Sequence, residues 1–294
     1  MKKFMKGIMI TLLSIGLLVP SLESKTYADS QPGDVIVTLG QDLTPSQKQT
    51  VLNDMGVTES SAQIVYVNNS EEHKYLSHYI PEAEIGSKTI SCAKITAGEK
   101  DSGLVVSTKN ITYITNDMYL NALSTAGVKD TKVYVTAPFP VSGTGALTGI
   151  IKAYEVSSGT TINENQKQVA NQEMVTTANL AKNIGPEKAA QFMKKVKEEI
   201  STQNPQTDAD MSALIQKVAN DMGISLTNDQ LNQLVDLFNK IKGLHIDWNK
   251  VSQTLQSAKQ KWENFANSKE GKSFIDSFIA FLKSIINAIA SLFK

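Results

Sequence analysis

The sequence predicts an α+β (or α/β) N-terminal domain with a sheet of about five strands, followed by an all-α C-terminal helical domain. Up to residue 156, short runs rich in β-branched residues alternate with helical segments, which is typical of a layered fold. From residue 157 the strand signal disappears, and apolar residues recur at helical spacing. A chain of 294 residues is long enough for two domains, each with its own hydrophobic core.

The first part of the chain contains both kinds of element, separated by turn-forming residues. Strands are expected at residues 34–39, 63–68, 90–97, 104–114 and 132–136. Helices are expected at residues 45–55, 71–79, 116–126 and 146–154. Thr44 and Gln47 form a capping box, and Pro45 suits the first helical position between them, so a helix should begin there. Gly56 is expected to end it.

The second part of the chain predicts only helices after a polar linker at 157–161. They are expected at residues 163–183, 187–202, 208–222, 228–242, 247–267 and 270–293. Thr227 and Gln230 form a second capping box. Apolar residues keep a coiled-coil-like seam through 228–267. This stretch can form one long helix or a hairpin that breaks near Gly243, and the spacing leaves both open.

Residues 1–28 are expected to be a secretory signal peptide that is cleaved after Ala28. Lysines precede an apolar run from Ile8 to Val19, and Thr26 and Ala28 place small residues at the −3 and −1 positions. The run is too short to cross a bilayer as a helix. We therefore expect a secreted, extracellular protein that associates with the cell surface. Its α/β domain would span 29–156, and its helical domain would span 157–294 and end in an amphipathic helix.

The charge of the chain is uneven, and all of its basic side chains are lysines. Residues 29–156 carry nine lysines and fourteen acidic residues, whereas residues 157–294 carry sixteen lysines and fourteen acidic residues. The planar guanidinium group of arginine makes bidentate hydrogen bonds to guanine and to phosphate. Its absence argues against nucleic acid as a partner.

One loop has the position of a ligand site. It follows the strand at 132–136 and opens the helix at 146–154, where backbone N–H groups and the helix dipole attract anions. Its glycines match neither a Walker A loop nor a dinucleotide-binding motif. The candidate ligand-binding residues are Ser142, Gly143, Thr144 and Gly145. The alternative interpretation is structural, with glycines in a tight turn and Thr144 as the helix N-cap.

No set of residues points to a catalytic centre, so the catalytic residues stay unknown. Ser91 and Lys94 have the spacing of a penicillin-recognising motif, but they fall in an expected strand and lack that motif's partners. The histidines do not have metal-ligand spacing. Cys92 is expected to be a small buried hydrophobic residue. We expect neither a metal nor a cofactor.

The C-terminal segment predicts an amphipathic helix with a basic polar side. Its apolar face is formed by Phe274, Phe278, Phe281, Leu282, Ile285, Ile289 and Phe293, among others. Such a helix can pack on the fold, or it can contact a membrane surface or a partner. The sequence leaves both open.

These features favour a non-enzymatic binding or interaction module of the cell envelope. Its partner would be a cell-wall polymer, the membrane surface or another envelope protein. Two alternatives remain. One is an extracellular enzyme with a site in the loop Gly143–Gly149, and the other is a membrane-active protein that acts through its C-terminal amphipathic helix.

Two segments resemble a known family. The first, at residues 34–44, reads DVIVTLGQDLT, and the second, at residues 141–155, reads VSGTGALTGIIKAYE. Together they resemble the YpuA-like secreted proteins of Gram-positive bacteria, a domain-of-unknown-function family. The resemblance implies an exported protein tied to the cell envelope. It implies no activity, cofactor or catalytic residue.

Overall fold

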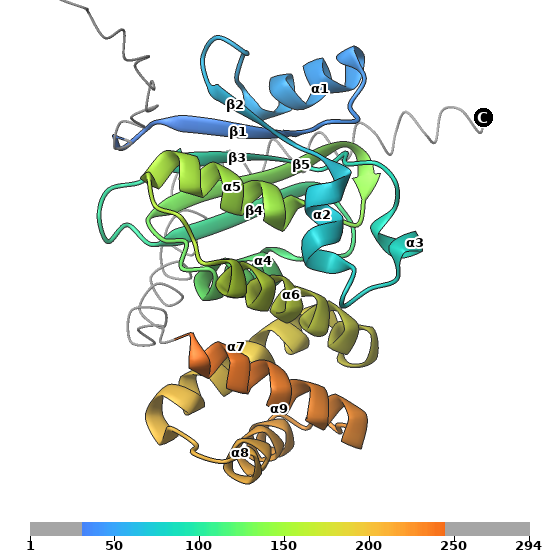
Figure 1. The fold of residues 1–294 in the computed structure, drawn as a ribbon, viewed down its shortest axis with the longest axis vertical. Coiled ribbons are helices and arrows are strands. Elements are labelled where there is room, and N and C mark those ends of the chain that lie inside the picture. The colour runs from blue at the N-terminus through green and yellow to red at the C-terminus, as the bar shows by residue number, and fades with distance from the viewer. Residues whose placement is uncertain (1–30, 245–294) are drawn as a thin grey trace, which may run out of the picture.

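A computed structural model describes residues 31–244 as a mixed sheet with helices on both faces, followed by a helical region (Figure 1). The expected signal peptide at 1–28 lies outside the described residues. So do the expected helices at 247–267 and 270–293, with the apolar face from Phe274 to Phe293. Whether residues 228–267 form a rod or a hairpin therefore stays a prediction.

The five expected strands form one sheet, with the order β2-β1-β3-β5-β4. Their bounds are β1 Val35–Gly40, β2 Gln63–Val67, β3 Cys92–Ala97, β4 Leu104–Ile111 and β5 Thr131–Val141. β3 is antiparallel to both of its neighbours, β1 and β5. The pairs β1–β2 and β4–β5 are parallel. The prediction of an α+β part with about five strands followed by a helical part is confirmed.

Nine helices are present between residues 31 and 244. Their bounds are α1 Pro45–Met55, α2 Asn69–Leu76, α3 Glu82–Ile85, α4 Asn116–Thr125, α5 Ala146–Ser158, α6 Glu164–Ile184, α7 Pro186–Gln203, α8 Asp208–Asp221 and α9 Asn228–Gly243. The short helix α3 was not expected from the sequence. One turn carries too few residues for a periodic pattern to reveal it.

The helix starts and stops follow the expected capping chemistry. Thr44 and Gln47 close a capping box at the start of α1, and Gly56 ends this helix in the left-handed conformation. Thr227 and Gln230 form the same box at α9. Further boxes begin α2 and α8, so each of these four helices begins where its own side chains satisfy the free N–H groups.

The last strand is longer than the sequence predicts. The expected strand ended at residue 136, whereas β5 continues through Pro138 and Pro140 to Val141. The hydrogen-bonded pairing of β5 with β3 ends at Thr136. Pro138 and Pro140 lie beyond this point, so their missing N–H groups break no hydrogen bond to β3. On the other side, β4 bulges at Asn110, whose φ of 58° is left-handed and whose side-chain amide donates to the Ala137 carbonyl.

The sheet separates two hydrophobic layers. α5 packs across β1, β2 and β3, and α4 packs on β4 of the same face, burying residues such as Ile95, Val135 and Leu147. A smaller core lies under α1 on the opposite face and includes Leu52 and Cys92. α6 joins the sheet region to the helices, because it contributes residues both to the core below the sheet and to the core formed with α7, α8 and α9.

Candidate functional site

The candidate loop lies at the edge of the sheet where four strands end. β1, β2, β4 and β5 run in the same direction, so their carboxyl ends meet at one edge. Residues 142–145 leave β5 at this edge and lead directly into α5. Ligands of open α/β sheets bind outside the carboxyl ends of strands, which makes this loop the natural place to look for a site.

The loop is packed against the protein rather than open. Ser142 is exposed, but Gly143, Thr144 and Gly145 are buried. The hydroxyl of Tyr119, a fully buried residue of α4, donates to the Gly143 carbonyl. Gly143 has a φ of 89°, and a Cβ there would lie 2.6 Å from the Tyr119 hydroxyl oxygen. The structure therefore requires glycine at position 143 for backbone conformation and for space.

Thr144 is not the N-cap of α5, so this expectation is wrong. Gly145 takes the N-cap position and makes no side-chain cap bond. The Thr144 hydroxyl lies 3.3 Å from the Ser142 hydroxyl instead. α5 begins at Ala146, as expected, so Gly145 immediately before it is the N-cap, and Thr144 lies one residue too early to cap the helix.

A buried carboxyl from α2 lies where a ligand of this loop would lie. Glu72 is 4% exposed. A Cβ added to Gly145 would lie 2.1 Å from one Glu72 carboxyl oxygen and 2.6 Å from the other. The carboxyl group is thus in direct contact with the N-terminus of α5, where backbone N–H groups attract negative charge.

The buried environment of Glu72 disfavours its charged form. Burial raises the pKa of Glu72 from 4.5 to about 7. The nearby Asp42 and Glu71 carboxylates raise this pKa further, whereas the Thr89 side chain lowers it. This group can accept or release a proton in the range where free carboxylates cannot.

The sequence analysis missed Glu72, although the chain holds a signal for it. Asn68 and Glu71 form the capping box of α2, and this box places Glu71 on the outer side, where Lys152 pairs with it at 2.6 Å. Successive helical residues are about 100° apart, so the neighbouring Glu72 points to another side of α2, where it meets Gly145.

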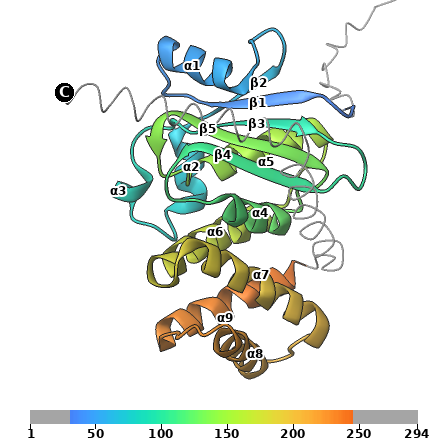
Figure 2. The same ribbon diagram turned by 180° about the vertical axis from the view of Figure 1, so that it is seen from behind.

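A second cluster lies on the sheet face that α1 partly covers. We define the lysine face as the side chains of Lys94 and Thr96 from β3, Val105, Ser107 and Lys109 from β4, and Lys132 and Tyr134 from β5. Each of these residues is partly or fully exposed, whereas alternate residues such as Ile95, Val106 and Val133 are buried on the other face. Figure 2 shows β4 and β5 in front of α5, with α1 at one end. Among the described helices, α1 is the one that contacts this face.

Asp54 at the end of α1 organises one border of the lysine face. It pairs with Lys109, and its other oxygen accepts hydrogen bonds from Tyr134 and Thr136, each at 2.8 Å. Burial alone would raise the pKa of Asp54, but these hydrogen bonds outweigh burial and lower the pKa. The Lys94 ammonium donates to the Met55 carbonyl and lies 6.0 Å from the centre of the Tyr134 ring.

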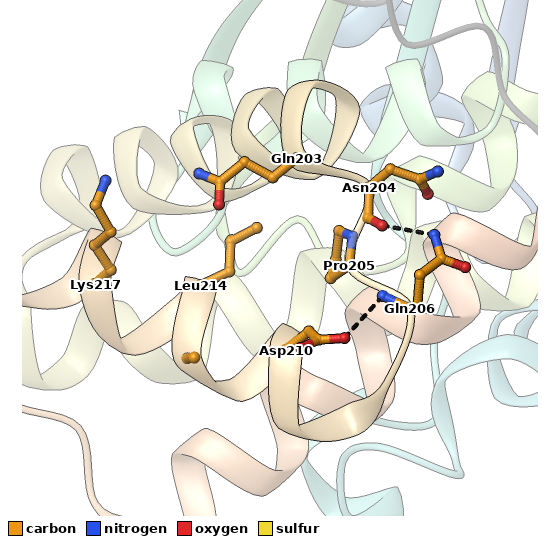
Figure 3. A pocket seen from close by; sticks show the side chains of 8 residues that line it. Gln203, Asn204, Pro205, Gln206, Asp210, Leu214 and Lys217 are labelled. Atoms are coloured by element: carbon orange, nitrogen blue, oxygen red, sulfur yellow. Dashed lines mark hydrogen bonds between the residues drawn. The ribbon is translucent and has the colours of Figure 1, made fainter.

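Two hollows lie among the helices that follow the sheet. The smaller, of about 420 Å³, is at the turn between α7 and α8 (Figure 3). Gln206 donates from its backbone to Asp210 and from its side chain to the Asn204 carbonyl, so the wall is held by its own polar groups. The larger, of about 700 Å³, lies between α8 and α9. Neither is lined by the candidate loop, and the sequence analysis predicted neither.

Metal and thiol chemistry receive no support from the described side chains. Residues 31–244 contain no group of three His, Cys, Asp or Glu side chains that could hold a metal ion. Cys92 is buried in β3 as expected, and burial raises the pKa of its thiol to about 12. None of the helices between residues 31 and 244 combines the length and the apolarity that a membrane crossing requires.

The fold and the packed loop define a two-part α+β protein whose candidate site is filled by the protein's own carboxyl group. The chain belongs to the family described as "Protein of unknown function (DUF1002)", whose model matches residues 39–258. It is 53% identical over 291 residues to the uncharacterized protein YpuA of Bacillus subtilis (strain 168), a match that covers 99% of this chain and all of that relative. The family resemblance expected from the two segments is confirmed. No solved structure matches the chain.

Proposed function

We propose that this chain is a secreted, cell-envelope-associated protein that acts as a non-enzymatic binding module. The observation that carries this proposal is the contact between Glu72 and Gly145. At the sheet edge where an enzyme of this architecture would hold its substrate, the protein places its own buried side chains. A partner would then bind to an exposed surface of the protein. The signal-peptide pattern of residues 1–28 is the reason for proposing an extracellular role.

Two measurements on the native protein test the location. Intact mass of material from the source cells should match a chain that begins at Asp29. Cell fractionation should find that chain with the envelope or in the medium. A full-length chain in the cytosol would contradict the proposal. Removing residues 270–294 should shift the protein from the envelope to the medium if that segment is the anchor, and an unchanged distribution would exclude this anchor.

The enzymatic alternative also has one specific observation in its favour. Glu72 has a pKa near the range that a general base needs, and it adjoins a loop with the exposed hydroxyl of Ser142. This alternative requires that the contact between Glu72 and Gly145 opens to admit a substrate. A loss of hydrolysis of envelope material on Glu72→Gln, with the fold retained, would favour it over the binding module.

A further inference from the structure

We propose that the lysine face binds a flexible phosphodiester polymer that carries free hydroxyl groups. This inference rests on the proposed envelope function and names the partner class. The apolar face of a sheet must be covered by another layer of the protein. This face is different, since its exposed members are charged and hydroxyl-bearing, with Val105 as the apolar exception among the residues that define it.

The strand register places these side chains in regular rows. Lys132 lies between Thr96 and Val105, and the next row of the same face has Tyr134 between Lys94 and Ser107. Strands lie about 4.8 Å apart, and residues of one face repeat about every 7 Å along a strand. Three ammonium groups and several hydroxyl groups therefore share a rigid surface with a spacing that a linear polymer can follow.

The charge of this surface is positive, although residues 29–156 as a whole carry five more acidic residues than lysines. Asp54 is the one carboxylate that bonds to the lysine face among the described residues, and it offsets Lys109. Lys94 is oriented by the Met55 carbonyl, which leaves its positive charge uncancelled. Lys132 is exposed, and no ion pair forms at its side chain within the described structure. The face thus keeps two net positive charges.

The chemistry of the face selects among possible occupants. The chain's own residues 245–294 carry seven lysines against four acidic residues, so charge repulsion disfavours them as a cover. Recognition of the bases of a nucleic acid uses arginine forks or rings on which the bases can stack. The chain has no arginine, and the ring of Tyr134 is already approached by Lys94. A phosphodiester polymer needs only ammonium groups for its phosphates and hydroxyl groups for its polyol units.

The test measures binding of the mature full-length chain to immobilised poly(glycerol phosphate) at several salt concentrations. Lys132→Glu reverses a charge on the face without breaking a side-chain hydrogen bond or ion pair in the described structure. Lys195→Glu is the matched control, because it makes the same change on an exposed residue of α7 that likewise forms no ion pair in the described structure. Binding should weaken roughly fivefold or more in Lys132→Glu, and less than twofold in the control. It should also weaken as salt rises.

Four outcomes would overturn the inference. Equal binding by both variants would show that another surface holds the polymer. Tighter binding to single-stranded DNA than to poly(glycerol phosphate) would show a nucleic-acid surface instead. Binding only after removal of residues 245–294 would show that this segment covers the face. If the intact chain sediments with envelopes and Lys132→Glu does so equally, the envelope function stands and the lysine face is not its site.

Discussion

The carboxyl group of Glu72 lies against the backbone of Gly145, so an acidic side chain of α2 occupies the start of α5. Both residues are buried, and they come from segments more than seventy positions apart in the chain. Their contact explains why the N-cap residue of α5 is glycine, although glycine supplies no capping side chain.

Replacing Gly145 with alanine should destabilise the protein by about 1–3 kcal/mol, because the new Cβ has no room beside the Glu72 carboxyl. The φ of Gly145 is −72°, so backbone strain does not contribute. Urea unfolding measures the loss. Gly243→Ala is the control, since no atom lies within 4 Å of a Cβ there, and it should be neutral or stabilising by up to about 1 kcal/mol. The loss at position 145 should shrink in a Glu72→Ala background, and equal losses in both backgrounds would contradict the contact.

Stability should fall as pH rises through the range in which folded Glu72 titrates. The pKa of Glu72 is near 4.5 in the unfolded chain and about 7 in the folded protein, so the folded protein holds this proton more tightly. The stabilisation from that proton is complete below about pH 4.5 and is lost as pH rises toward 7. The Glu72→Gln variant has no carboxyl proton at this position, so its stability does not depend on this titration. Relative to this variant, the wild type should become less stable by on the order of 3 kcal/mol between about pH 4 and pH 8. Parallel curves would refute this assignment.

The buried ion pair between Lys197 and Glu173 joins α7 to α6, with an N–O distance of 2.6 Å. Lys197 also donates to the Asn121 carbonyl of α4, so the pair connects three helices. Lys197→Met should cost about 3–5 kcal/mol, because it leaves a charged Glu173 without its partner. The double variant Lys197→Met/Glu173→Leu should recover much of this loss.

The exposed pair of Lys217 and Asp221 provides the control for this measurement. Its atoms lie 3.7 Å apart, and both side chains are more than half exposed. Lys217→Met should therefore change stability by no more than about 1 kcal/mol. If the variants at positions 197 and 217 lose similar amounts of stability, burial does not determine how much the pair of Lys197 and Glu173 stabilises the protein.

Cys92 should resist thiol reagents in the folded protein. Its side chain is buried beneath α1, and the raised pKa of about 12 leaves little thiolate at neutral pH. A chromogenic aromatic disulfide should react with Cys92 only after the protein is unfolded in guanidinium. Cys92→Ala serves as the blank, and rapid labelling of the native protein would show that this part of the sheet opens.

Local signals predicted most of the fold. Capping boxes such as Thr44 with Gln47 and terminators such as Gly56 act within a few residues, so the sequence displays them directly. The sequence did not predict the end of β5, because residues such as Pro138 and Pro140 normally exclude a strand. The two prolines are tolerated because the pairing with β3 stops at Thr136 and because β4 bulges at Asn110. Both features depend on strands that are distant in the sequence.

The place of the candidate loop between a strand and a helix was predicted, but the side chains that pack against it were not. The glycines at 143 and 145 marked the loop, yet their purpose is to admit Tyr119 and Glu72, which the fold brings from other helices. The lysine face was missed for a similar reason. Lys94, Lys109 and Lys132 look unremarkable on separate strands, and only the register places them together.

The placement of β3 has a consequence for how the chain acquires its structure. β1 and β2 can pair as soon as both exist, but the middle of the sheet needs β3 beside β1, and β4 has no partner until residues 131–141 are available. Pairing between distant segments slows folding. A chain emerging from its N-terminus therefore stays incompletely ordered until its first half is present.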